Sequence, residues 1–476
     1  MKTSYSSLAF LAAVAVVVVP SATTGFVVPT VVASSSTSTS TSSLNVAAEP
    51  PSAPSKKLIS PPKNIADLKD TSEELYDDNV QSTYGRYKLT IDSGHGCYLK
   101  TTDGKEYLDC VSGIATCALG HNNPVLTEAI SNQMKKVHHV SNLYYIPEQA
   151  ALAEWLCANS NADKAFFCNS GAEANEAAIK LARRYASNNG ITKPVIISAH
   201  QSFHGRTLAA LSATQQPKYH KGFTYDGEMV QGFDACTYNN IAELEEAVIR
   251  ATSDGKGLAA IMLEPLQGEG GIIPGNVDFF KKARELCDKH KALLIIDEVQ
   301  AGMGRTGTLW GHEQLDIIPD VFTSAKALGG GVPIGAMMAR GDAASTFGPG
   351  DHASTYGGNP LACAAGLAVA KYICDNNILD NVEARGQQLK AGLEKLSKKY
   401  PTVLGDVRGW GLLRGVECIA DDITAGELVA AAMNEGLLLV PAGTNVVRFV
   451  PPLIITEDEL NIALDRLDAA VKSKAN

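Results

Sequence analysis

The residue with the clearest chemical potential is Lys326, in the segment Asp-Val-Phe-Thr-Ser-Ala-Lys-Ala-Leu-Gly-Gly-Gly (320–331). The apolar residues before it predict a short strand buried on both faces, where a charged lysine is unfavourable. Burial lowers the pKa of a lysine and provides the free amine that condenses with an aldehyde into a Schiff base. The glycines at 329–331 would let the backbone approach a bulky cofactor. A surface lysine before a flexible loop is the competing interpretation.

A carboxylate follows another apolar run, because Asp297 comes directly after Leu293–Ile296 in Asp-Glu-Val-Gln (297–300). An acid at the end of a buried central strand is costly unless it meets a cation. The protonated ring nitrogen of pyridoxal phosphate is such a cation, and its proton is what makes that cofactor an electron sink. The sequence therefore places a candidate cofactor anchor before Lys326.

A possible phosphate site lies in Ser-Gly-Ala-Glu-Ala-Asn-Glu (170–176), ahead of a helix predicted over 177–185. Residues such as Ser170, Gly171 and Ala172 at a helix start leave backbone N–H groups free. Together with the helix dipole, these groups form an anion site suited to phosphate. Ordinary N-capping is the alternative explanation.

The segment Ser-Phe-His-Gly-Arg (202–206) puts an aromatic ring and a guanidinium within one turn. Phe203 could stack on a ring and Arg206 could bind a carboxylate, although a packed phenylalanine and a surface arginine are the simpler alternative. We expect a structural role for His204, because nothing nearby completes a metal site, and we expect no metal in this protein.

Two further segments carry groups that could bind anions, and a third carries an acid that could pair with one of them. Arg448 lies in the apolar run Val446–Val450, so it needs a carboxylate partner, and either Glu269 or a substrate would serve. Glu269 lies among glycines and could equally be a solvated loop acid. The hydroxyls of Ser354 and Thr355 could bind phosphate or cap the Ala-rich helix predicted from about residue 361.

The elements that must position these groups alternate between short apolar runs and helical patterns from about residue 125 to 340. Such alternation predicts parallel strands joined by crossover helices. Ligands of these sheets bind beyond the carboxyl ends of the strands, where most of the polar segments above lie. A hairpin turning at 102–105 is predicted ahead of this region, and a smaller α/β unit after about residue 380. The five predicted strands cover 165–167, 195–197, 258–263, 293–296 and 321–323.

One motif suggests a different chemistry, since Gly-Met-Gly-Arg-Thr-Gly (302–307) matches the G-x-G-x-x-G dinucleotide fingerprint. Its context is unfavourable, because Gly302 comes six residues after the predicted strand instead of in the turn that directly follows it. Asp320, which stands roughly where a ribose-binding acid is sought, precedes its strand instead of ending it. A nicotinamide-dependent oxidoreductase is therefore the weaker interpretation.

Composition and charge limit the class of protein. The 476 residues are 45% hydrophobic and 19% charged, which is typical of a soluble globular enzyme of about three domains. The net charge of −10 argues against nucleic acid and anionic membrane surfaces as partners. The ten cysteines are scattered without a C-x-x-C pair, which indicates reduced thiols.

Residues 1 to about 50 predict a targeting segment. Lys2 precedes the apolar run 8–19, which is too short to span a bilayer and is typical of a signal peptide. Beyond Phe26, the chain is rich in serine and threonine and contains no acid before Glu49. This bipartite arrangement resembles the plastid address of algae with secondary plastids, whereas a mitochondrial presequence should be rich in arginine. A membrane anchor or secretion is the alternative for the apolar run.

Taken together, the motifs at 170–176, 203–206, 297–300, 326–331 and 354–360 resemble those of the class III pyridoxal-phosphate aminotransferases, in family order. The resemblance runs from about residue 83 to the C-terminus. Thr-Tyr-Gly-Arg-Tyr (83–87) and His-Val-Ser-Asn-Leu-Tyr-Tyr (139–145) look like the acetylornithine aminotransferase branch.

The resemblance implies a pyridoxal 5′-phosphate cofactor and assigns roles around its ring. Lys326 would be the Schiff-base lysine and then the base that carries the proton between substrate and cofactor. Asp297 would hold the ring nitrogen, and Gln300 the phenolic oxygen. Phe203 and Val299 would enclose the ring from its two faces.

For the phosphate, the resemblance implies Ser170, Gly171 and Ala172, together with Thr355 of the neighbouring subunit, and therefore an obligate homodimer. The resemblance also implies substrate-binding residues. Arg206 and Ser354 would bind the carboxylate end of acetylornithine. Arg448 would bind the α-carboxylate of glutamate, with Glu269 as its switch partner.

The expected fold is α/β of fold-type I, with a mostly parallel sheet between helices and a smaller α/β domain from the N-terminal and C-terminal parts. Predicted boundaries are 1–50 for targeting, 51–64 for a linker that leads to a fold start near Ile65, 65–124 for the N-terminal segment, 125–370 for the large domain and 371–476 for the small domain.

The expected reaction converts N2-acetyl-L-ornithine and 2-oxoglutarate to N-acetyl-L-glutamate 5-semialdehyde and L-glutamate in arginine biosynthesis, in the plastid stroma or alternatively the mitochondrial matrix. Ornithine, 4-aminobutyrate and succinyldiaminopimelate aminotransferases are the alternatives within the family. A non-catalytic protein of the same fold would require loss of the lysine or the aspartate, and both are present.

Overall fold

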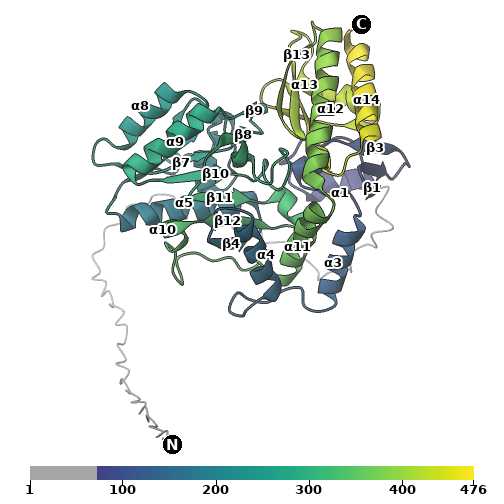
Figure 1. The fold of residues 1–476 in the computed structure, drawn as a ribbon. Helices are drawn as coiled ribbons and strands as arrows, with labels where there is room; N and C mark the ends of the chain where they lie inside the picture. Colours follow the sequence, from purple (N-terminus) through teal and green to yellow (C-terminus); the bar gives the residue numbers. More distant parts are fainter. Residues whose placement is uncertain (1–71, 476) are drawn as a thin grey trace, which may run out of the picture. The chain divides into compact units, whose positions relative to one another are not determined.

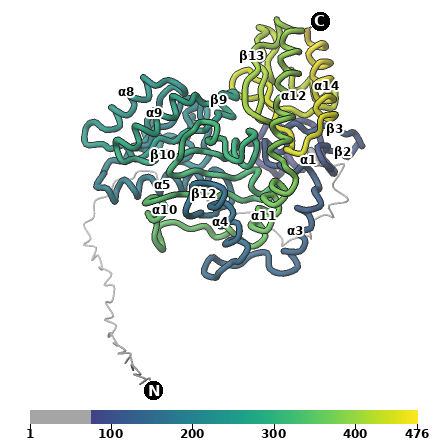
Figure 2. The backbone as a smooth tube through the Cα atoms, in the orientation of Figure 1, coloured from purple at the N-terminus to yellow at the C-terminus, as the bar shows by residue number. Residues whose placement is uncertain are grey.

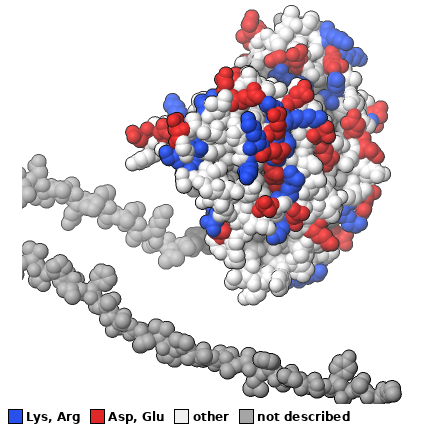
Figure 3. Space-filling view, turned by 60° about the vertical axis from the view of Figure 1, so that its left-hand side comes forward, with Lys and Arg blue, Asp and Glu red and all other residues white. Residues whose placement is uncertain are grey.

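The computed structural model describes residues 72–475 (Figure 1). The predicted targeting segment, the linker and the expected start of the fold near Ile65 lie outside the described residues. Within the described part of the chain, every helix is too short or too polar to cross a membrane. On the face seen in Figure 3, acidic and basic side chains are interspersed, as on a solvated protein surface.

The central element is a seven-stranded sheet in the order β4-β12-β11-β10-β7-β5-β6. All of its strands run in the same direction except β12, which pairs antiparallel with β11 and β4. This mostly parallel sheet confirms the expected fold class. The strands are β4 (Lys164–Cys168), β5 (Pro194–Ala199), β6 (Phe233–Cys236), β7 (Gly257–Leu263), β10 (Leu293–Asp297), β11 (Val321–Ser324) and β12 (Gly335–Ala339).

The inner strands form because their residues are apolar on both faces. In β10, Leu294 and Ile296 pack on the side of helices α8 and α9, whereas Leu293 and Ile295 pack on the side of α5. Figure 1 shows these helices on opposite sides of the sheet. All five predicted strands are present, and the sequence prediction omitted only β6 and β12 of this sheet.

Helix α5 begins at Gly171, six residues before the predicted start. Ser170 is its N-cap, and the Ser170 hydroxyl accepts a hydrogen bond from the backbone N–H of Glu173 (3.2 Å). The polar motif at 170–176 is therefore the first part of the helix and not a loop before it. The predicted Ala-rich helix is confirmed as α11, which starts at Pro360 with Asn359 as its cap.

The smaller part of the fold combines both ends of the described chain. Strand β3 pairs with β2 in the predicted hairpin and, on its other side, with β15 from the C-terminal region, where Leu437 lies opposite Leu108. Figure 2 shows this meeting of the purple and yellow parts of the backbone. A second sheet, β13-β14-β17-β16, carries Arg448 in β17. The predicted domain boundaries themselves stay a prediction.

The other strands are β1 (Ile91–His95), β2 (Tyr98–Thr101), β3 (Glu106–Asp109), β8 (Leu266–Gln267), β9 (Ile273–Pro274), β13 (Leu404–Trp410), β14 (Leu413–Cys418), β15 (Leu437–Leu438), β16 (Val440–Ala442) and β17 (Val446–Phe449). The helices are α1 (Ser72–Asn79), α3 (Pro124–Met134), α4 (Pro147–Ala158), α5 (Gly171–Asn188), α6 (Leu208–Ala213), α7 (Pro217–His220), α8 (Ile241–Ala251), α9 (Val277–His290), α10 (Gly341–Ala344), α11 (Pro360–Asp375), α12 (Ile378–Lys399), α13 (Ala425–Asn434) and α14 (Glu457–Ala475). Short 3₁₀ turns cover η2 (Gly311–Leu315) and η3 (Lys326–Gly329), and α2 (Ser112–Ala115) is a left-handed turn.

Candidate active site

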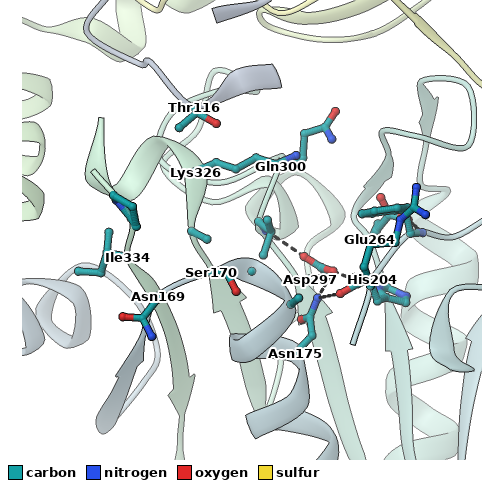
Figure 4. Close-up of a pocket in the computed structure, with 18 of the residues that line it drawn as sticks. Thr116, Asn169, Ser170, Asn175, His204, Glu264, Asp297, Gln300, Lys326 and Ile334 are labelled. Carbon is teal, nitrogen blue, oxygen red and sulfur yellow. Dashed lines mark hydrogen bonds and ion pairs between the residues drawn. The ribbon is translucent and has the colours of Figure 1, made fainter. Parts of the chain in front are cut away.

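A cavity of about 370 Å³ lies beyond the carboxyl ends of the parallel strands (Figure 4). Most of the predicted site residues line it, although they come from segments more than 150 residues apart. This is the position at which open α/β sheets bind their ligands. The lining residues with predicted roles are Ser170, Gly171, Ala172, Phe203, Arg206, Asp297, Val299, Gln300 and Lys326.

Asp297 is buried at the base of this cavity and is held by hydrogen bonds from three directions. Its Oδ2 accepts from Asn175 Nδ2 (2.8 Å) and His204 Nδ1 (2.8 Å), and its Oδ1 accepts from the Val299 backbone N–H (3.0 Å). Thr323, opposite Asp297 on β11, donates its hydroxyl to Asn175 Oδ1 (2.8 Å) and so orients the amide. These donors stabilise an ionised carboxylate inside the protein.

His204 supplies a compensating charge for that carboxylate. Burial opposes the charged imidazolium, but the hydrogen bond and charge of Asp297 raise the pKa of His204 above its ordinary value. The His204 backbone N–H also donates to Thr214 Oγ1 (2.8 Å), which fixes the residue in its loop. His204 therefore positions Asp297. Among the described residues, no group of three or more candidate metal ligands occurs.

Lys326 lies at the start of η3 with a positive φ of 45°, a strained conformation for a residue with a side chain. Desolvation inside the cavity lowers the pKa of its amine to about 8, although Glu269 and Asp297 oppose this change. Its Nζ makes no hydrogen bond to another residue in the described range. The amine is therefore available to a ligand, as Figure 4 shows by its extension across the cavity.

The N-terminus of α5 forms another wall of the cavity. The backbone N–H groups of Gly171 and Ala172 lie in the first turn, where a helix provides no acceptor. Gly171 also packs so closely on Val299 that a Cβ at position 171 would lie 2.6 Å from a Val299 methyl carbon. A side chain here would displace Val299, so the glycine is required for the geometry.

Phe203 is fixed in the facing wall by Glu264 at the end of β7. One carboxylate oxygen of Glu264 accepts from the Phe203 backbone N–H (3.0 Å), and the other accepts from the Gly268 N–H (3.1 Å). Burial, assisted by the nearby Asp297 charge, raises the pKa of Glu264 to about 7. Glu264 therefore links the aromatic wall to the loop that carries Glu269.

Arg448 and Glu269 form an ion pair beside Gln300 of the cavity lining, which is one of the two pairings that the sequence suggested. Arg448 Nη1 donates to Glu269 Oε1 (2.5 Å) and to Gln300 Oε1 (2.9 Å). Burial alone would raise the pKa of Glu269, but the charges of Arg448 and Lys326 lower it below its ordinary value. Gln300, expected near the phenolic oxygen of a cofactor, is in this structure bound to the arginine.

The remaining predicted residues lie at or beyond the cavity edge. Arg206 is exposed and forms part of the lining, with its guanidinium over aromatic rings. The Ser354 hydroxyl accepts hydrogen bonds from Asn169 Nδ2 (3.2 Å) and the Gly357 N–H (3.0 Å). Thr355 is exposed and is not part of the cavity lining of this chain.

Sequence reasoning assigned no role to Asn175, Glu264 or Thr323, and only a general structural role to His204. Each lies within or beside a motif that was already identified, and each follows or ends a predicted strand or begins a helix. The sequence signal that could have identified them as site residues was therefore their position near the carboxyl ends of predicted strands. The hydrogen bonds join residues as far as 148 positions apart, so the sequence did not indicate the pairing.

The dinucleotide motif has no matching structure. The segment 302–307 leads to η2 at Gly311 instead of opening a helix. Asp320 is occupied by structural contacts, accepting from the Leu294 backbone N–H (2.8 Å) and pairing with Arg284 (2.7 Å) and Arg340 (3.1 Å). This geometry argues against a nicotinamide cofactor at that loop.

The cavity combines a buried acid, a desolvated lysine and a helix N-terminus that can bind an anion. This combination defines a site for pyridoxal-phosphate chemistry. A family model described as aminotransferase class-III matches residues 80–471, and the chain belongs to this family.

Individual relatives agree with that assignment. The chain is 56% identical over 402 residues to the acetylornithine aminotransferase of Nostoc sp., covering 84% of this chain and 93% of the relative. It is 55% identical to the acetylornithine aminotransferase of Thermosynechococcus vestitus, covering 85% and 98%.

Solved structures give the same result. The N-acetylornithine aminotransferase of Stenotrophomonas maltophilia is 39% identical with a TM-score of 0.71, over 83% of this chain and 98% of that one. The ornithine aminotransferase of Toxoplasma gondii is 30% identical with a TM-score of 0.80, over 85% and 95%.

The residues present fit pyridoxal 5′-phosphate, the cofactor of the family. The free N–H groups at the start of α5 suit a phosphate. The Phe203 ring and the Val299 methyl groups suit the two faces of an aromatic ring. The Asp297 carboxylate would suit the ring nitrogen, and the Lys326 amine would suit the aldehyde.

The lowered lysine pKa predicts how cofactor capture depends on pH. Cofactor-free protein should react covalently with pyridoxal 5′-phosphate faster as pH rises through about 8, instead of near the ordinary lysine value of 10.5. Replacing Glu269→Gln removes a charge that raises this pKa and leaves Arg448, which lowers it. The midpoint should therefore move to lower pH.

Absorbance-detected capture rates between pH 6 and 10 test this expectation. Glu246→Gln on the exposed surface of α8 is the matched control and should keep the midpoint of the unmodified protein. A Glu269→Gln midpoint that stays fixed or moves upward would contradict the electrostatic account of Lys326.

Proposed function

We propose that this chain transfers the terminal amino group of N2-acetyl-L-ornithine to 2-oxoglutarate, giving N-acetyl-L-glutamate 5-semialdehyde and L-glutamate. Its place would be in arginine biosynthesis. The observation that carries the proposal is that Lys326 and Asp297 line one cavity and that Arg448, paired with Glu269, binds Gln300 of its lining. The identity of more than half of the aligned residues with cyanobacterial acetylornithine aminotransferases supports the choice of substrate.

Bound pyridoxal 5′-phosphate would supply an electron sink that makes the carbon next to the transferred nitrogen acidic. Asp297, oriented by His204 and Asn175, would hold the ring nitrogen and favour its protonated form. Lys326 would hold the cofactor through its aldehyde, and its free amine would be the base that moves the proton at the substrate carbon.

Two arginines would allow one cavity to accept both substrates. Acetylornithine presents a terminal amine with its carboxylate several bonds away, and this carboxylate would bind Arg206 and Ser354 at the edge. Glutamate carries a carboxylate beside the reacting carbon, which would displace Glu269 and bind Arg448. The ion pair of Arg448 with Glu269 keeps the deeper arginine neutralised while acetylornithine is bound.

We also propose a homodimer in which Thr355 binds the phosphate in the partner subunit. Thr355 is exposed, and Tyr356 beside it leaves 63% of its surface exposed. The nearby loop carries Leu143 and Tyr145, which are 85% and fully exposed, and Asn142 ties this loop to the Gly357 carbonyl (2.9 Å). Large apolar side chains that are exposed on two loops in contact with each other are typical of a protein interface.

For the N-terminal region, we propose a plastid address in residues 1–50 and a linker in 51–64. Composition supports this, because the region combines an apolar run with an acid-free Ser/Thr-rich stretch, and the family match begins only at residue 80. A reporter fused to residues 1–64 should accumulate in plastids of an alga with secondary plastids. Accumulation in mitochondria would favour the alternative.

The choice of acetylornithine over ornithine is tested in the first half-reaction. Free ornithine places an ammonium group near Arg206 where acetylornithine has a neutral amide, and this repulsion should lower kcat/KM by about tenfold or more. Single-turnover absorbance changes of the holoenzyme with each amine provide the measurement. Equal rates, or a preference for ornithine, would replace this assignment with an ornithine aminotransferase.

The shared site predicts complementation between two inactive variants. Lys326→Ala loses the amine, and Thr355→Asp places a negative charge against the phosphate. If each site combines Lys326 of one subunit with Thr355 of the other, a hybrid dimer contains one intact site. Random co-expression should then restore about a quarter of the unmodified activity.

Activity is compared for the purified co-expressed mixture and for the two variants mixed after purification, which keeps the homodimers separate. A co-expressed mixture no more active than the separate variants would place Thr355 in its own subunit's site and contradict the shared arrangement.

A further inference from the structure

The guanidinium of Arg206 reaches the cavity edge without a carboxylate partner. Among residues 72–475 it forms no ion pair and no hydrogen bond, in contrast to Arg448 with its 2.5 Å contact to Glu269. An exposed arginine ordinarily samples many rotamers, and this freedom must be lost when it binds a carboxylate. Another feature of the structure must therefore hold Arg206 toward the cavity.

Two aromatic rings provide that support. The Arg206 guanidinium carbon lies 3.8 Å from the centroid of the Tyr219 ring and 5.4 Å from that of Phe203. The two rings meet edge to face, with centroids 6.0 Å apart and an angle of 82° between their planes. A planar guanidinium stacks favourably on an aromatic face while its N–H groups stay free in the ring plane.

Tyr219 lies in the short helix α7, which is held in place by side-chain hydrogen bonds of the residues at its two ends. Gln216, directly before this helix, donates its amide to the Ser202 carbonyl (3.0 Å). His220, directly after Tyr219, places its Nε2 at 2.6 Å from the Thr214 carbonyl. The ring is thus tied to the loop that carries Phe203 and Arg206, and its position relative to the guanidinium is set by folding.

We infer that Tyr219 is a positioning residue that holds Arg206 unpaired at the cavity edge and thereby sets the affinity for the distal carboxylate of the substrate. This inference rests on the proposed function, in which Arg206 binds that carboxylate. A ring attracts the guanidinium without neutralising it, whereas an acidic partner would have to be displaced by each substrate. Arg206 therefore stays available throughout the cycle, while Arg448 is available only when Glu269 moves.

The same ring also carries a second cation, which provides a matched control. The Lys218 ammonium lies 4.8 Å from the Tyr219 centroid, but Lys218 is outside the cavity lining. Removing Lys218 tests the general loss of positive charge near the entrance, and removing the Tyr219 ring tests the orientation of Arg206.

The experiment measures binding of N-acetyl-L-norvaline to the holoenzyme by isothermal titration calorimetry. This probe keeps the acetyl group and carboxylate of acetylornithine but lacks the reacting amine. Tyr219→Leu should raise its Kd about fivefold, the size of effect expected for one cation–π contact, and Tyr219→Phe should bind within about twofold of the unmodified protein. Tyr219→Met repeats the comparison with the side-chain volume retained and the ring removed.

Turnover and a double variant show whether the ring acts through Arg206. In Tyr219→Leu, the KM for acetylornithine should rise by the same factor while kcat stays unchanged. Arg206→Ala should weaken probe binding, and the double variant Arg206→Ala/Tyr219→Leu should bind no more weakly than Arg206→Ala alone. Lys218→Ala should keep the Kd within about twofold, because it leaves the stacked guanidinium in place.

The outcomes separate this inference from the proposed function. Weak binding in Arg206→Ala with unchanged binding in both Tyr219→Leu and Tyr219→Met would overturn the role of Tyr219 alone. If Tyr219→Leu weakened probe binding by the same factor in the Arg206→Ala background as in the unmodified protein, this role would also be overturned, because the ring would then act independently of Arg206. Unchanged binding in Arg206→Ala would overturn the assignment of Arg206 itself.

Discussion

Desolvation of one amine is the physical constraint on which the rest of the site depends. Lys326 follows a buried strand and is desolvated inside the cavity, so its charged form is disfavoured. Any unpaired acid nearby would reverse this effect. Asp297 is occupied by His204 and two other donors, and Glu269 by Arg448. Both carboxylates thus have hydrogen-bond partners in the network around the cavity, and the pKa of the lysine amine stays below its ordinary value.

The two arginines are held by different physical means, and that difference matches two kinds of substrate. Arg448 comes from β17 in the C-terminal sheet and is buried against Glu269, which compensates its charge. Arg206 comes from the loop after β5 and rests on the face of Tyr219 without a partner charge. In the proposed function, Arg448 would bind a carboxylate near the reacting carbon after Glu269 moves away. Arg206, which has no acidic partner, would bind a carboxylate far from that carbon.

Much of this arrangement could be predicted from sequence because buried strands are apolar on both faces and ligands bind where such strands end. Asp297 and Lys326 were identified on this basis. The antiparallel strand β12 was missed, since Gly-Ala-Met-Met-Ala has weak β-propensity. The partners of Asp297 were missed for another reason: His204 and Asn175 meet it only after the sheet has formed, across 93 and 122 positions. Local patterns do not contain such pairings.

The most direct test of the account is to locate the covalent bond between protein and cofactor. Holoenzyme is reduced with borohydride, which makes a carbon–nitrogen double bond permanent, and is then digested and examined by mass spectrometry. The account predicts one pyridoxyl-phosphate modification, on the peptide that contains Lys326. Modification of another lysine, or none in an active and cofactor-loaded sample, would contradict the central role of the desolvated amine.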